Sequence, residues 1–319
     1  MKKTIFLLPL LCLTVAAWAQ ERIEPIPFGH LDQWAVRYIK ESKILGGKTK
    51  TLYAVAPTDT LRMNAPFEYG RHGNPWSVSS AYARVSGIDK ASGTVSPERR
   101  GKGFCARLDS RLDTVSALGI VDLKVIVAGS LFTGKTIEPV TNKGTSDPYS
   151  IIDMGVPFTK HPVALMLDFK SYVENSNVIT YAKATSKPKN KEGHDCPQMT
   201  ILLQHRWEDA DGNIYARRVG TGCVRIDRTY TEWQNDFRIP IRWGDITQQP
   251  GFQDYEGLNV SAFKATNKQG KMVPINETGY GLENPTHVII MLSSGHYEAF
   301  VGHAGNTLWV DNIRWVYDE

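Results

Sequence analysis

Short apolar runs recur along the whole chain and are separated by Gly, Pro, Asn and Asp. Within most runs, apolar residues alternate with polar ones, which is the period of a half-buried β-strand. In the run from Val163 to Tyr172, one face is apolar, and Asp168, Lys170 and Tyr172 share the other face. Many such strands with turn residues between them are typical of an antiparallel all-β sandwich or barrel.

A second alternating run spans residues 200–209. It places Gln204, Arg206 and Glu208 on one face and predicts that Trp207 lies in the core with the apolar residues of the other face. In the run 121–130, Lys124 lies opposite a row of valines and leucine. The run 286–294 is apolar on both faces, which predicts a central strand.

Two segments leave alternatives open. Leu31 to Ile44 is the only plausible helix of the chain, but its apolar residues also fit a strand. Residues 207–218 predict a hairpin turning at Asp211-Gly212. They also resemble a calcium loop, but its glycine and its final acid are misplaced, so the hairpin is favoured.

The last strand, within 303–319, has the polar pair Asp311-Asn312 at its centre. Both residue types tolerate unusual backbone angles and bond their own chain, which favours a β-bulge. Alternatively, Asp311 could ligate a structural calcium with partner oxygens from Glu41 or from backbone carbonyls near the first strand. No second acid is linked to it in sequence, so the structural role is favoured. No other cofactor is predicted.

Residues 1–19 have the features of a secretory signal peptide: two lysines, an apolar run and the small residues Ala17 and Ala19. We therefore expect an exported protein, in the periplasm, at the cell surface or outside the cell. No later segment is apolar for long enough to span a membrane. The formal net charge is +4, of which the leader carries two, and this near balance argues against nucleic-acid binding.

Three cysteines follow the leader: Cys105, Cys196 and Cys223. Export permits disulfides, but an odd number leaves at least one thiol unpaired. A chain of this length can build a large core without cross-links. We therefore expect free, mostly buried thiols.

The stretch NTLWVDNIRWVY, 306–317, resembles the closing strand of the putative carbohydrate metabolism domain family, PCMD. The segments 129–135, 147–159 and 164–172 agree with it in order, as does Trp76 after Asn74-Pro75. The resemblance covers about residues 75–319. It implies a β-sandwich jelly roll with a carbohydrate pocket on one face, and we expect a single domain over 20–319.

Sugars are bound by aromatic rings together with planar polar groups. The strand faces above therefore supply most of the expected ligand-binding residues: Lys124, Asp168, Lys170, Tyr172, Gln204 and Arg206. This requires that their strands adjoin in one sheet. Trp76 is expected as a stacking platform for the sugar ring; Trp207 is a second candidate platform, for which the core is favoured. The ordinary alternative is a solvated outer face with cross-strand ion pairs.

The function favoured by the sequence is binding of a carbohydrate or glycan. A glycoside hydrolase is the alternative, and it needs two carboxyl groups about 5–9 Å apart, for which Asp168 and Glu208 are the candidates if their strands adjoin. A structural or adhesive envelope protein without a sugar site is the third possibility.

Overall fold

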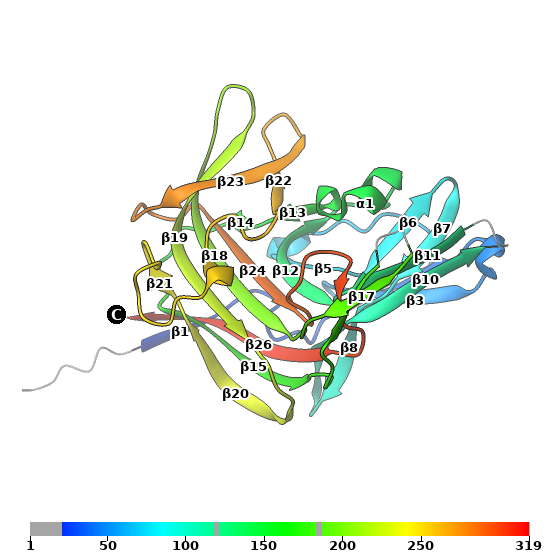
Figure 1. Ribbon diagram of the computed structural model, residues 1–319, viewed down its shortest axis with the longest axis horizontal. Helices are drawn as coiled ribbons and strands as arrows, with labels where there is room; N and C mark the ends of the chain where they lie inside the picture. Colours follow the sequence, from blue (N-terminus) through cyan, green and yellow to red (C-terminus); the bar gives the residue numbers. More distant parts are fainter. Residues whose placement is uncertain (1–20, 118–120, 183–186, 319) are drawn as a thin grey trace, which may run out of the picture.

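The structure is a computed structural model that describes residues 21–117, 121–182 and 187–318. It is an all-β fold in which two large sheets pack face to face, so the predicted sandwich is confirmed (Figure 1). Within the described residues, the helices are α1 (Asn142–Ser146) and the short 3-10 turns η1 (Lys43–Leu45), η2 (Arg71–Gly73), η3 (Pro148–Ile151) and η4 (Asp254–Glu256). None of the described helices is long and apolar enough to cross a membrane.

The first sheet carries the candidate site. Its strands, in spatial order, are β20 (Tyr230–Pro240), β15 (Ala164–Tyr172), β26 (Thr307–Asp318), β9 (Gly103–Asp109) and β8 (Val95–Arg100), and β1 (Glu21–Pro25) also pairs with β26. These strands come from both ends and the middle of the chain. The last strand, β26, lies between β15 and β9 and is therefore near the centre of its sheet.

The second sheet is built around long strands. Its order is β14 (Val156–Pro157), β24 (His287–Ser293), β18 (Gln198–Glu208), β19 (Ile214–Arg225), β23 (Met272–Tyr280), β22 (Lys264–Thr266), β13 (Ile152–Met154), β12 (Ser130–Thr136) and β5 (Trp76–Val78), with β21 (Arg242–Trp243) on β19. β24 pairs with β12, β14 and β18, which confirms the predicted central strand.

Four small sheets complete the fold. They are β3 (Thr49–Val55) with β2 (Trp34–Lys40) and β4 (Asp59–Leu61); β6 (Ala81–Val85) with β7 (Ile88–Ser92); β10 (Arg111–Ala117) with β11 (Val121–Val127); and β17 (Lys189–Glu192) with β16 (Val178–Tyr181) and β25 (Val301–Gly302). The helix alternative for 31–44 is wrong. Residues Trp34 to Lys40 form a strand, whose β-branched and aromatic side chains suit a pleated sheet.

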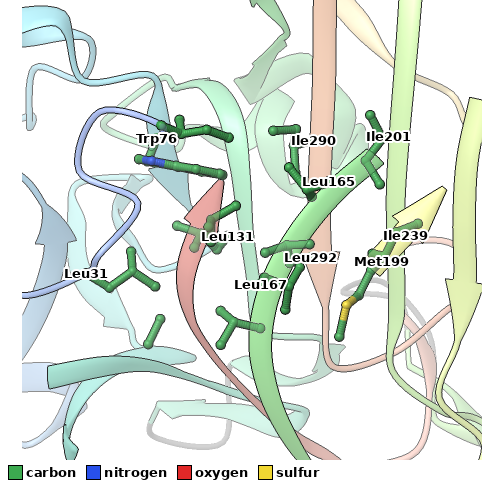
Figure 2. Close-up of a cluster of buried hydrophobic side chains, with 14 of the residues drawn as sticks. Leu31, Trp76, Leu131, Leu165, Leu167, Met199, Ile201, Ile239, Ile290 and Leu292 are labelled. Atoms are coloured by element: carbon green, nitrogen blue, oxygen red, sulfur yellow. The ribbon is translucent and has the colours of Figure 1, made fainter. Parts of the chain in front are cut away.

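The main core lies between the two large sheets (Figure 2). Leu165 and Leu167 of β15 face Ile201 of β18 and Ile290 of β24 across this layer. Because alternate residues of a strand point to opposite faces, this packing fixes which residues of β15 reach the outer surface.

The hairpin at residues 207–218 is confirmed. Glu208 pairs with Ile214, and the carboxylate of Asp209 accepts bonds from the amides of Asp211 (3.0 Å) and Asn213 (2.8 Å). The acid therefore caps its own turn.

Candidate functional site

The outer face of the first sheet brings together three of the predicted residues. Asp168 and Lys170 point outward from β15, opposite Asp311 and Trp309 of β26. Tyr172 lies further along the same face and is exposed. The predicted grouping of Asp168, Lys170 and Tyr172 follows from the inward packing of their neighbours.

The Asp311-Asn312 pair forms the predicted bulge. Met166 pairs with Arg314 and Asp168 with Asp311, so β26 has one more residue than β15 between these two pairs. Asn312 has a φ of 50°, in the left-handed region that Asn tolerates better than most residues. The bulge keeps Val310 and Ile313 in the core while both polar residues reach the outer face.

Asp168 is buried and is held by several donors. It accepts bonds from the backbone amide of Asp236 (2.9 Å) and the side-chain amide of Asn312 (2.7 Å), and it pairs with Arg100 at 2.8 Å. Burial raises the pKa of this carboxyl, but these donors outweigh burial and hold the pKa below its ordinary value.

Asp311 is buried beside it and has fewer partners. One oxygen accepts a bond from the amide of Asn312 at 2.8 Å, and the other pairs with Arg100 at 2.7 Å. Here burial outweighs the donors, and the charge of Asp168 adds to it, so the pKa of Asp311 is raised. Two adjacent carboxyl groups therefore differ in proton affinity.

Glu41 does not supply a partner oxygen for a calcium ion at Asp311, because its carboxylate is engaged elsewhere. That carboxylate accepts a bond from the amide of Ala91 and pairs with Lys50. Among the described residues, no group of three or more His, Cys, Asp or Glu side chains is placed to hold a metal ion. One carboxylate oxygen of Asp311 is paired with the guanidinium of Arg100.

Two tryptophans and three cations alternate across this face. In order they are Arg107, Trp309, Lys170, Trp233 and Arg100, and we call this set the tryptophan–cation row. The cations lie 5.2 and 4.4 Å from the ring centre of Trp309, and 5.8 and 3.9 Å from that of Trp233. These distances are those of cation–π contacts.

The row keeps polar groups available to a ligand. Glu98 pairs with Arg107 at 3.1 Å and lies 3.7 Å from Lys170, and all three side chains are partly exposed. The indole nitrogen of Trp309 is buried and has no hydrogen-bond partner in the described part of the chain. Because this nitrogen is buried, the polar groups that a ligand can reach are those of Arg107, Glu98 and Lys170.

Gln204 and Arg206 lie elsewhere, on β18 of the second sheet. Gln204 is buried and donates to Glu277 at 2.7 Å, and the ion pair of Glu277 with Arg218 is also buried. Arg206 donates to Gln204 at 2.8 Å, and burial lowers the pKa of its guanidinium to about 10. These side chains form an internal polar network.

The expected pairing of Asp168 with Glu208 does not occur. β15 pairs with β20 and β26, whereas β18, which carries Glu208, pairs with β19 and β24 in the other sheet. Glu208 accepts a bond from the amide of Lys268 at 3.0 Å. The carboxyl group that adjoins Asp168 is that of Asp311.

Trp76 is wholly buried in the main core, and its indole nitrogen donates to the carbonyl of Pro27 at 2.9 Å. It therefore offers no ring face to a sugar. Trp207, which the alternation placed in the core, is 41% exposed and stacks on Tyr215, because β18 continues beyond the part of the sandwich that the first sheet covers. Lys124 lies on β11 in a separate two-stranded sheet and so does not join the other rows.

Sequence reasoning missed Arg100, Trp233 and the role of Trp309. Alternation along the last strand would have placed Trp309 on the face of Asp311. Trp233 could not be assigned, because β20 contains register shifts against β15. Arg100 reaches the site from β8, and the sequence does not show that β8 and β26 flank the same strand.

The three cysteines are free, as predicted, and two of them are buried. Cys196 lies 3.6 Å from Nδ1 of His296, and the same nitrogen lies 3.2 Å from Asp195. A catalytic triad uses one ring nitrogen of the histidine for the nucleophile and the other for the acid. Here both groups contact Nδ1 of His296, so the arrangement is not a catalytic triad. Burial also raises the pKa of the Cys196 thiol to about 11, so the thiol stays protonated.

Fold and site together define an all-β sandwich with an aromatic and charged outer face. The family model described as "Putative carbohydrate metabolism domain" (PCMD) matches residues 59–316, and the chain belongs to this family. The match begins before residue 75, where the sequence resemblance began.

Solved structures that are similar to the chain include the following two. One is described as a putative glycoside hydrolase from Bacteroides thetaiotaomicron, with 18% identity over 89% of this chain and 71% of that one and a TM-score of 0.47. The other is TmCBM61 in complex with β-1,4-galactotriose, with 10% identity over 77% and 89% and a TM-score of 0.26. Both scores are below 0.5, so neither structure bears on function. A comparison with curated proteins gives no match.

Proposed function

We propose that the protein binds carbohydrate on the outer face of its first sheet, at the tryptophan–cation row. The observation that carries this proposal is the setting of Trp309, a partly exposed indole flanked by Lys170 and Arg107. Membership of the PCMD family supports a role in carbohydrate metabolism.

The chemistry of the row suits a sugar. Pyranose rings present C–H groups that pack on aromatic surfaces and hydroxyl groups that need donors and acceptors. Trp233 and Trp309 supply the aromatic surfaces. Lys170, Arg107 and Glu98 supply the hydrogen-bond donors and acceptors. Asp168 lies beneath them and fixes Arg100, so its role is positioning.

A glycan array of the protein without residues 1–19 tests the proposal, with a Lys170→Ala variant beside it. Lys170 is partly exposed and Glu98 keeps its pairing with Arg107, so the variant is expected to fold. We expect the wild type to bind a set of glycans and the variant to bind them about tenfold more weakly. Absence of binding by the folded wild type would remove the proposal.

Glycosidic hydrolysis is a second candidate function, favoured by the pair Asp168 and Asp311. Both carboxylates contact the same nitrogen of Arg100, so these oxygens lie within the about 5–5.5 Å separation of retaining glycosidases. The pKa of Asp311 is raised and that of Asp168 lowered, which is the division between a proton donor and an ionised partner. Arg100 would have to leave the pair for a substrate to reach it.

Release of reducing ends from the glycans that the protein binds on the array tests hydrolysis. We expect Asp311→Asn to abolish release while binding persists. If the wild type releases no sugar from any bound glycan, the protein is a binding module and the pair is structural.

The signal-like start supports action outside the cytoplasm. The intact mass of the protein purified from cell fractions tests this, and we expect a chain that begins at Gln20 in the exported fraction. A full-length chain confined to the cytoplasm would contradict export.

A further inference from the structure

A cavity of about 420 Å³ lies away from the tryptophan–cation row. It is lined by residues between Ala35 and Asn74, from β2, β4 and the segment that leads through η2, and we call it the β2–β4 pocket. Its volume falls within the range of small-molecule sites. None of the residues that form the row lines it.

The floor of the pocket contains a buried ion pair. Arg37 is 1% exposed and binds both carboxylate oxygens of Glu138, one of them at 3.0 Å, and it also donates to the carbonyl of Ala65 at 3.2 Å. Glu138 further accepts the backbone amides of Phe67 and Tyr82, each at 2.9 Å. The carboxylate is thereby fully engaged and fixes the guanidinium.

Arg37 keeps donors for a ligand. A guanidinium has five N–H bonds, and acceptors among the described residues take three of them. Its charge is already balanced by Glu138, so an anion would gain little there. The remaining donors therefore suit a neutral oxygen, such as a hydroxyl, ring ether or carbonyl oxygen.

The walls add apolar surface and an acceptor. Leu61, Met63 and Phe67 line the pocket, and Met63 is 62% exposed at its mouth. Asp59 lies at the rim, where its carboxylate can accept hydroxyl protons. An apolar wall with separate donors and acceptors is the composition that recognises a neutral sugar ring.

The pocket is preformed, because the segment after β4 is tied to the rest of the fold. Asn64 accepts from the amide of Lys40 (2.8 Å) and donates to its carbonyl (2.7 Å). Asn74 donates to the carbonyl of Val55 at 2.5 Å. Between these ties, His72 lines the pocket with a φ of 55°, in the left-handed region.

We propose that the β2–β4 pocket binds one neutral monosaccharide unit. Arg37 donates to a sugar oxygen, Asp59 accepts from a hydroxyl group, and the side chains of Phe67 and Met63 cover an apolar face of the ring. The pocket shares no residue with the row, so either site can bind without the other.

Saturation-transfer NMR of the full chain with D-glucose, D-galactose, D-mannose, L-fucose and N-acetyl-D-glucosamine tests the pocket. We expect transfer to at least one sugar and about a tenfold rise in its Kd for Met63→Ala, which removes the apolar cover of the sugar ring. Leu282→Ala is the matched control, because Leu282 is 83% exposed and does not line the pocket. It should bind as the wild type does.

The outcomes separate this proposal from the one above. Transfer that Met63→Ala weakens and Lys170→Ala leaves unchanged supports the pocket. Transfer that Met63→Ala leaves unchanged, or that Lys170→Ala alone removes, overturns the pocket and leaves the row as the sugar site. No transfer to any of the five sugars, with the protein folded, also overturns the pocket, and glycan-array binding then decides the row independently.

Discussion

At the residue scale, the candidate site depends on one buried carboxylate. Asp168 gathers Arg100, Asn312 and the backbone of Asp236 around itself. A buried charge of this kind stabilises the fold only while its donors are in place, and removing one member leaves the others unsatisfied.

Asp168→Asn is therefore expected to lower the free energy of unfolding at pH 7 by about 2 kcal/mol, the usual loss for hydrogen bonds to a charged group. The folded pKa of Asp168 lies below the ordinary 3.8, so its contribution is present above that pH and disappears as the pH falls through the folded pKa. Urea unfolding of both proteins at several pH values measures this. Asp236→Asn, on an exposed carboxylate, should change little, and a gap that persists at the lowest pH would contradict the assignment.

Trp76 is predicted to matter for the stability of the fold and not for glycan binding. It is fully buried, so Trp76→Ala should lower stability by about 3–5 kcal/mol and leave glycan binding intact at temperatures where the variant is folded. Thermal unfolding and the glycan array measure the two effects. A variant of normal stability that no longer binds would show that Trp76 contacts the ligand after all.

Residue-level prediction from sequence succeeded where alternation alone decides orientation. Asp168, Lys170 and Tyr172 share a face because their neighbours Leu167 and Phe169 are core residues. It failed for Trp207, because alternation gives the side of a strand but not how far the opposing sheet extends over it. It failed for Trp76 because no alternating run was available to orient that ring, which lies in the core.

At the element scale, the bulge in β26 shapes the site. It turns Asn312 outward toward Asp168 without moving Ile313 out of the core. The bulge was predictable because Asp and Asn in the middle of an apolar strand are otherwise costly. The partner of the bulge was not, because strand pairing between residues 168 and 311 is a long-range property.

Substitutions at Asn312 separate its two roles. Asn312→Ala should lower stability by about 1–2 kcal/mol more than Asn312→Gly, because only the alanine adds the steric cost of a left-handed backbone. Both variants lose the bond to Asp168, so the difference isolates the backbone. Equal losses in urea unfolding would indicate that the bulge relaxes when the residue is replaced.

At the scale of the whole molecule, the two large sheets divide most of the predicted residues between them, and Lys124 lies in a third, smaller sheet. The sequence predicted the all-β class because short alternating runs and turn residues recur throughout. It could not assign β15 and β18 to different sheets, since both runs have the same pattern of apolar and polar residues. The single-site grouping of Asp168 with Gln204 and Arg206 failed for that reason.

The most direct test of the account is hydrogen–deuterium exchange of the full chain with and without the glycan that binds it best on the array. The account predicts slower exchange in β15, β20 and β26, which carry Lys170, Trp233 and Trp309, and little change in the β18–β19 hairpin with its exposed Trp207. Protection confined to that hairpin, or to the network around Gln204 and Arg206, would contradict the assignment of the sugar site to the outer face of the first sheet.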